Sequence, residues 1–267
     1  MKRLVLAVCM AMAWTVPAAA EIKLKAVEYR DGKTVLEGVL AYDDASKAPR
    51  PGVIVVHEWK GLNDYVQRRA GQLARLGYVA FCADMYGKGV RAKDHQEAAK
   101  LSGIYRSDRQ LMRARITAAL DYVKRQPMVD PQHLAAIGYC FGGTSVLELA
   151  RSGADVLGVV SFHGGLDTPH PEDAKQIKGR VLALHGGADT FVTPEQVRAF
   201  EQEMTQAHVN YQLIIYPGAV HSFTVFDAGT DPSKGMAYNE EADHQSWEAM
   251  TRFLQELFGP ATLQHTG

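Results

Sequence analysis

The side chain best suited to covalent chemistry is a cysteine in a glycine-rich turn. Cys140 lies within GYCFGG, residues 138–143, between an expected strand and an expected helix. A G-x-S-x-G nucleophile elbow with Cys in place of Ser has this form, and its glycines make room for a sharp turn. The helix N-terminus favours the thiolate, and the amide of Phe141 can donate to an oxyanion. Taken alone, the motif fits a small buried residue equally well.

Two polar residues that follow later strands could complete the chemistry. Asp189 ends the stretch LHGGAD (184–189), and His221 follows the last expected strand. Nucleophile, acid and histidine come in this order in α/β-hydrolases. An imidazole that takes the thiol proton increases the thiolate fraction, and a carboxylate on its other nitrogen fixes the tautomer. We therefore expect a triad of Cys140, His221 and Asp189, and the rival acid Asp167 comes one strand early.

A third polar loop follows the apolar run 53–56. Its amide at Trp59 could be the second oxyanion donor, and Glu58 places a carboxylate at the end of a buried strand. Three histidines also follow strands, and we interpret them as hydrogen-bonded pocket walls: His57, His163 and His185. The sequence contains no H-E-x-x-H or other metal-ligand spacing, so we expect no metal.

Strand and helix patterns alternate along the chain. Residues 22–29 and 34–42 flank the turn signal Asp31-Gly32 and predict a hairpin. Strands are then expected at 53–56, 78–82, 134–139, 156–162, 181–184 and 211–216. Helices are expected at 65–76, from Ser107, at 142–151, from the capping box Thr193–Gln196, and at 239–258. This order predicts an α/β-hydrolase fold, a mostly parallel sheet with helices on both faces, as one domain over residues 21–267. Sites in such sheets form at the carboxyl ends of the strands.

The first twenty residues have the pattern of a secretory signal peptide. A basic start precedes a short apolar run, and small residues end at position 20. The apolar run is too short for a spanning helix, so we expect an exported, periplasmic or secreted protein that is not membrane-bound after cleavage. A net charge of −1 offers no field for nucleic acid.

Cleavage at residue 20 would leave two cysteines, Cys82 and Cys140. A disulfide is not expected, because an intervening strand would separate them by about 9.5 Å. Bridged Cα atoms lie within about 7 Å of each other.

The chain resembles the dienelactone hydrolase (carboxymethylenebutenolidase) family from Val53 to the final helix. The resemblance rests on the motifs His57-Glu58, Asp84-Met85-Tyr86-Gly87, residues 138–143, residues 185–189 and His221-Ser222-Phe223. It implies the Cys140, His221 and Asp189 triad, an oxyanion hole at the amides of Trp59 and Phe141, contact between Glu58 and the resting thiol, and no cofactor.

The chain departs from this family at the substrate carboxylate. Dienelactone-opening members hold it with two arginines, and here the corresponding positions carry Lys88, with Arg91 nearby, and Val225. Lysine lacks the two-pronged guanidinium geometry and valine lacks the charge. We therefore predict a monomeric hydrolase of small esters or lactones rather than of dienelactone in particular. Lys88, Arg91, Ser222 and His163 are the candidate substrate contacts.

Three other functions are compatible with the same residues. An acyltransferase would use the same triad with an alcohol as acceptor. A periplasmic small-molecule binder would keep the fold without turnover. A redox-responsive protein would use an oxidisable Cys140, although no resolving cysteine lies close in sequence.

Overall fold

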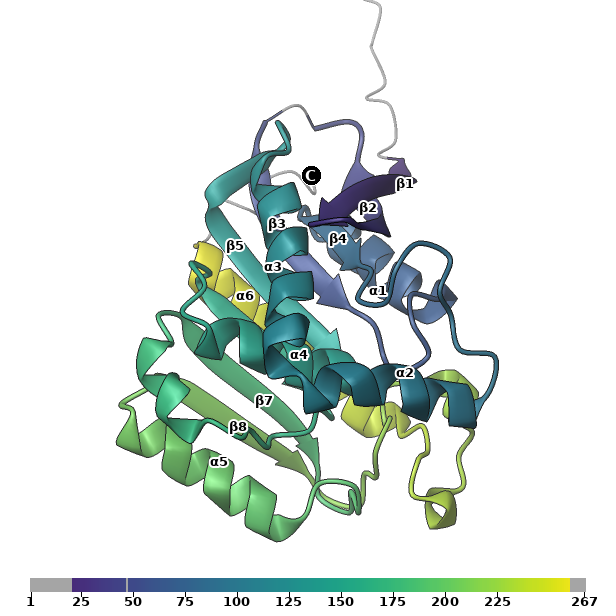
Figure 1. Cartoon of the computed structure of the whole chain (residues 1–267), viewed down its shortest axis with the longest axis vertical. Coiled ribbons are helices and arrows are strands. Elements are labelled where there is room, and N and C mark those ends of the chain that lie inside the picture. Colours follow the sequence, from purple (N-terminus) through teal and green to yellow (C-terminus); the bar gives the residue numbers. More distant parts are fainter. Residues whose placement is uncertain (1–20, 47, 260–267) are drawn as a thin grey trace, which may run out of the picture.

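The computed structural model describes residues 21–46 and 48–259. The expected signal peptide, residues 1–20, lies outside them, as do residues 260–267. The described chain forms one eight-stranded sheet in the order β1-β2-β4-β3-β5-β6-β7-β8 (Figure 1). Its strands are β1 (Ile22–Asp31), β2 (Thr34–Asp43), β3 (Arg50–Val56), β4 (Val79–Ala83), β5 (Val129–Tyr139), β6 (Gly158–Phe162), β7 (Arg180–Gly186) and β8 (Tyr211–Tyr216).

The predicted hairpin and parallel sheet are confirmed. The β1–β2 hairpin is antiparallel and pairs with β4 through β2, whereas β4, β3, β5, β6, β7 and β8 run parallel. The helices are α1 (Asp64–Arg75), α2 (His95–Ser107), α3 (Arg109–Lys124), α4 (Phe141–Arg151), α5 (Pro194–Gln206) and α6 (Glu240–Phe258). None of the helices in this described part is long and apolar enough to cross a membrane.

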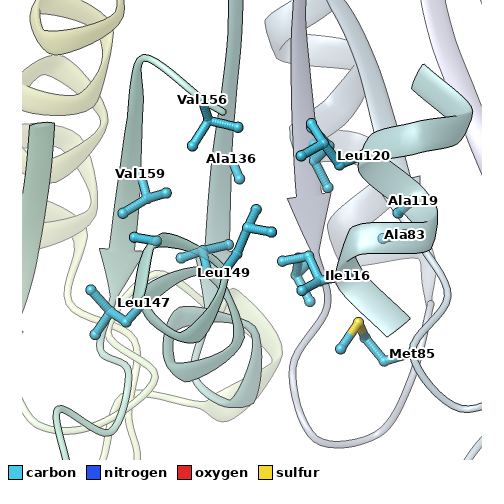
Figure 2. Packing of buried hydrophobic residues seen from close by; sticks show 14 of the residues in the cluster. Ala83, Met85, Ile116, Ala119, Leu120, Ala136, Leu147, Leu149, Val156 and Val159 are labelled. Atoms are coloured by element: carbon cyan, nitrogen blue, oxygen red, sulfur yellow. The ribbon is translucent and has the colours of Figure 1, made fainter. Parts of the chain in front are cut away.

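Both faces of the sheet are covered by helices. Successive side chains of β3 point to opposite faces, so Ile54 and Val56 join one apolar cluster and Val53 and Val55 join another. The first cluster includes side chains of α3, α4 and α5, and the second includes those of α1 and α6. Figure 2 shows Ile116 and Leu120 of α3 and Leu147 and Leu149 of α4 in the first cluster.

Two cysteines and two helix starts test the local predictions. Strand β3 separates β4, which carries Cys82, from β5, and both Cys82 and Cys140 are free thiols, as predicted. The capping box of α5 is present. The predicted helix start at Ser107 is wrong, because Ser107 ends α2 and donates its hydroxyl back to the carbonyls of Gly103 and Ile104. Asp108 caps α3 instead, by accepting from Leu111 N–H.

Buried ion pairs fix the helix that follows Cys140. Arg151 in α4 donates to Glu148 Oε1 at 3.0 Å and to Glu203 Oε1 of α5 at 2.7 Å. Arg113 of α3 donates to Glu148 Oε2 at 2.9 Å. A buried carboxylate is tolerated when it is paired in this way. Helix α4 is thus tied to its neighbours on both sides.

The glycines around Cys140 allow backbone to touch backbone. A methyl group on Gly138 would lie 2.0 Å from Gly142 O, and one on Gly142 would lie 2.3 Å from Val56 O. Gly143 packs in the same way against Gly164. The turn can therefore form only with glycine at these positions, as expected for a nucleophile elbow.

We expect Gly142→Ala to destabilise the protein by about 3 kcal/mol or more, because backbone atoms of β3 would have to move. Gly103→Ala in α2 is the matched control, since nothing lies within 4 Å of its added methyl group. The control should stabilise the helix by about 0.5–1 kcal/mol. Urea unfolding of both variants measures the difference. Equal stabilities would contradict the steric account of the elbow.

Candidate active site

Three side chains from separate strand ends meet at the carboxyl edge of the sheet. Cys140 follows β5, Asp189 follows β7 and His221 follows β8. The Nε2 atom of His221 lies 3.0 Å from Cys140 Sγ, and its Nδ1 atom lies 2.8 Å from Asp189 Oδ2. All three residues are buried. The geometry is that of a thiol, a base and a carboxylate that orients the base.

The backbone of Cys140 has an uncommon conformation. Its φ of 52° and ψ of −111° place a non-glycine residue in a region that costs about 1–3 kcal/mol. Its N–H donates to Phe162 O at 2.9 Å and to His163 Nδ1 at 3.1 Å. These two acceptors hold the residue where its side chain stands at the first turn of α4. The positive end of the helix dipole then favours a thiolate.

The environment of His221 favours its protonated form. Burial acts to lower its pKa, but the charge of Cys140 and the hydrogen bond to Asp189 act in the opposite direction and raise the pKa to about 10. Edge-on aromatic contacts flank the imidazole, with ring centroids 5.3 Å away in His163 and 5.2 Å away in Phe191. Asp189 Oδ2 accepts from Nδ1, so the proton that can be exchanged with Cys140 sits on Nε2.

The carboxyl group of Glu58 faces Ser222. Ser222 Oγ donates to Glu58 Oε1 at 3.2 Å, and Ser222 itself has a φ of 58°. Burial raises the pKa of Glu58, against the opposing charge of His221 and the bond from Ser222. Among the described residues, the hydrogen-bond partner of this carboxyl group is Ser222 and not the thiol of Cys140.

Two main-chain amides are available as oxyanion donors. Within residues 21–46 and 48–259, neither the Trp59 N–H nor the Phe141 N–H donates to a protein acceptor. The tight approach of Gly142 to the end of β3 brings their two loops together. His57 supports the first loop by donating from Nδ1 to Glu58 O at 2.6 Å and accepting from Met85 N–H at 3.2 Å. Burial lowers the pKa of His57 to about 4, so this ring is neutral.

The cationic candidates for substrate contact are engaged elsewhere. The ammonium of Lys88 pairs with Glu28 and with Glu37 on the hairpin. Arg91 donates to the carbonyls of Leu62 and Val90 and lies 3.7 Å from Asp84. Both side chains already have protein partners, and their contact with a substrate stays a prediction.

The predicted substrate contact of His163 is corrected. The side chain is fully buried and uses both ring nitrogens, accepting from Cys140 N–H and bonding Thr224 Oγ1 through Nε2 at 2.8 Å. Burial lowers the pKa of His163 well below its usual value. The alternative interpretation as a hydrogen-bonded wall histidine fits the geometry, and the same bonds link the elbow to the loop after His221.

Three supporting residues were missed from the sequence. Thr224 and Tyr65 share a 2.6 Å hydrogen bond, and Arg69 donates to Thr224 O at 3.0 Å and pairs with Asp243. Only the nearness of Thr224 to His221 in sequence could have pointed to it. Tyr65 and Arg69 lie in α1 and reach the site only through the folded sheet. Within the described ranges, no group of three or more His, Cys, Asp or Glu side chains could hold a metal ion.

The mostly parallel sheet, its flanking helices and the elbow after β5 define the α/β-hydrolase class. The sequence profile of the Dienelactone hydrolase family matches residues 36–258. The chain therefore belongs to the Dienelactone hydrolase family and is a hydrolase.

Relatives agree with this assignment over most of their length. The solved structure named m3DLH is 42% identical with a TM-score of 0.86, covering 89% of this chain and 99% of that one. The dienelactone hydrolase-like promiscuous phosphotriesterase P91 from metagenomic libraries is 40% identical with a TM-score of 0.85, covering 90% and 100%. A Synechocystis sp. protein with a provisional carboxymethylenebutenolidase name is 27% identical over 250 residues, 88% of this chain and 97% of that protein.

We expect alkylation of Cys140 by iodoacetamide to stay nearly constant between pH 7 and 9. The pKa of His221 is about 10, so its positive charge beside the sulfur is present below that pH and is lost above it. In His221→Ala that positive charge is absent, so alkylation should be slower at pH 7 and should speed up as the pH rises. Mass spectrometry of samples quenched at a series of times measures the alkylation rate of both proteins at each pH. Identical profiles would show that His221 does not set the ionisation of the thiol.

We expect Glu58→Gln to stabilise the protein at pH 7 and not at pH 4. The pKa of Glu58 is raised by burial, so the folded state binds its proton more tightly than the unfolded state does. Ionisation of Glu58 therefore costs stability as the pH rises, whereas Gln carries no charge and can still accept from Ser222. Thermal unfolding at the two pH values gives the comparison, with Glu201→Gln, at an exposed position of α5, as the control. A Tm gain that is the same at both pH values would contradict this account.

Proposed function

We propose that the protein is a cysteine-dependent hydrolase of small carboxylic esters or lactones. The observation that carries the proposal is the unbroken series of contacts from Cys140 Sγ to His221 Nε2 at 3.0 Å and from His221 Nδ1 to Asp189 at 2.8 Å. The pKa of about 10 for His221 supports a thiolate–imidazolium pair at neutral pH. Ser222, the residue after His221, donates to the carboxyl group of Glu58 next to this pair.

In the acylation half of the reaction, the Cys140 thiolate attacks the carbonyl carbon. A carbon–sulfur bond forms and the carbonyl electron pair moves to oxygen, where the free amides of Trp59 and Phe141 stabilise the charge. The oxyanion then collapses and the bond to the leaving oxygen breaks. His221 gives its Nε2 proton to that oxygen, so the alcohol leaves neutral and the imidazole becomes neutral.

In the second half, water hydrolyses the thioester. Neutral His221 takes a proton from water as its oxygen attacks the carbonyl carbon, and the same amides hold the new oxyanion. Collapse breaks the carbon–sulfur bond, which releases the carboxylic acid and restores the thiolate and the imidazolium. No redox equivalent or cofactor enters the cycle.

The substrate is proposed to be small and without a carboxylate that needs a dedicated arginine pair. Lys88 is paired with two glutamates, and Val225 is a buried apolar residue. A strained lactone or an activated ester suits a thiolate, because its leaving oxygen departs readily. We also propose that the protein acts outside the cytoplasm, on the grounds of residues 1–20, and that it acts as a monomer.

The test is hydrolysis of p-nitrophenyl acetate and a lactone panel by the protein without residues 1–20. We expect Cys140→Ala to lose more than about 10³-fold in kcat/KM together with rapid iodoacetamide labelling, because the nucleophile is removed. Cys82→Ala is the matched control and should keep its activity, since Cys82 is buried, with Sγ directed to Val66 O. The panel includes a phosphotriester because the relative P91 is described as a promiscuous phosphotriesterase.

The outcomes separate the competing functions. Turnover that survives in Cys140→Ala would exclude the thiol mechanism. Rapid labelling of the wild type without turnover of any ester, lactone or phosphotriester would favour the redox function. Ester products formed with added alcohols would favour an acyltransferase. If Cys140 neither labels nor turns over substrate, the protein is a binder.

A further inference from the structure

We propose that the ring of Phe191 is the wall against which the alcohol part of the substrate packs, so that esters of apolar, aryl-bearing alcohols are preferred. This inference rests on the proposed ester hydrolysis and specifies its substrate class. Phe191 is a specificity-determining residue in this account and takes no part in bond making.

The position of Phe191 is fixed by the same carboxylate that orients the base. Asp189 Oδ1 accepts the Phe191 N–H at 2.8 Å, while Asp189 Oδ2 bonds His221 Nδ1. The Phe191 ring lies edge-on to the His221 imidazole, with centroids 5.2 Å apart and an interplanar angle of 62°. Despite this anchoring, 58% of Phe191 is exposed to solvent. The apolar ring of Phe191 is thus exposed beside the proposed base and is accessible to a ligand.

The chemistry places the leaving group on this side of the site. His221 Nε2 delivers its proton to the leaving oxygen, so the carbon attached to that oxygen must lie next to the imidazole. The fully buried His163 occupies one flank of His221, and the exposed Phe191 occupies another. The carbonyl oxygen points instead toward the amides of Trp59 and Phe141. In this proposal the alcohol leaves along the exposed flank, over the Phe191 ring.

The segment facing Phe191 is pinned to the same histidine. A backbone bridge pairs His221 with Met236, and Ala237 N–H donates to His221 O at 3.1 Å. Gly235 lies opposite Phe191, whose Cε2 atom would be 3.4 Å from a methyl group on that glycine. The ring of Phe191 therefore contacts the imidazole of His221 on one side and lies close to Gly235 on another. Such a wall favours an apolar aromatic alcohol.

The experiment compares esters that differ on one side only, with acetic acid release as the readout for benzyl acetate and methyl acetate. We expect Phe191→Ala to lower kcat/KM about tenfold for benzyl acetate, mainly through KM, and less than about twofold for methyl acetate. Phe191→Leu should recover most of the loss. For methyl phenylacetate, whose ring is on the acyl side, kcat/KM should change less than about twofold in Phe191→Ala. Phe226→Ala is the control, since Phe226 is 72% exposed and its ring contacts Tyr238.

A second readout does not depend on turnover. Benzyl alcohol should slow iodoacetamide labelling of Cys140 in the wild type and in Phe226→Ala, but not in Phe191→Ala. Equal loss for benzyl and methyl acetate, or equal protection in all variants, would overturn the role of Phe191. If the wild type hydrolyses no ester while protection still depends on Phe191, the proposed hydrolysis fails and the apolar wall stands.

Discussion

The strained backbone of Cys140 is the constraint on which the site depends. A non-glycine residue at a φ of 52° persists only where its surroundings fix it, and here two acceptors hold its N–H while glycines admit β3 against α4. His163 and Ser222 also have positive φ values, and both adjoin the triad. The buried ion pairs of α4 are far from the chemistry but resist relaxation of this turn. The packing and ion pairs of the helices on the sheet thus maintain the strained backbone conformation of Cys140 at the carboxyl edge of the sheet.

The buried histidines at the carboxyl edge of the sheet differ in the direction in which their pKa is shifted. Four histidines lie at this edge, and burial lowers the pKa of His57, of His163 and of His185. His57 and His163 remain neutral and serve as hydrogen-bond bridges. His221 is equally enclosed, but contact with Cys140 and Asp189 raises its pKa. The distinction between a structural and a reactive histidine therefore comes from a charged partner rather than from exposure.

The sequence was sufficient for the fold and for which triad residues would meet, because both follow from local patterns. Alternating apolar runs predict the sheet, and residues directly after parallel strands must share one edge. It did not indicate which partners a side chain meets in space. Lys88 turns to Glu28 and Glu37, and His163 turns inward to Thr224, as no spacing along the chain could indicate. Ser107 resembled a helix cap only because the preceding α2 was not recognised.

The two carboxylate oxygens of Asp189 accept hydrogen bonds from different groups. Oδ2 accepts from Nδ1 of His221, and Oδ1 accepts from the backbone N–H groups of Phe191 and Val192. Because they belong to one carboxylate, the basicity of the histidine and the conformation of this loop are thermodynamically linked. By reciprocity, whatever displaces the loop changes the proton affinity of His221 by the same free energy with which protonation of His221 holds the loop in place. In the proposed reaction, departure of the alcohol past Phe191 and preparation of the imidazole for water would then be coupled.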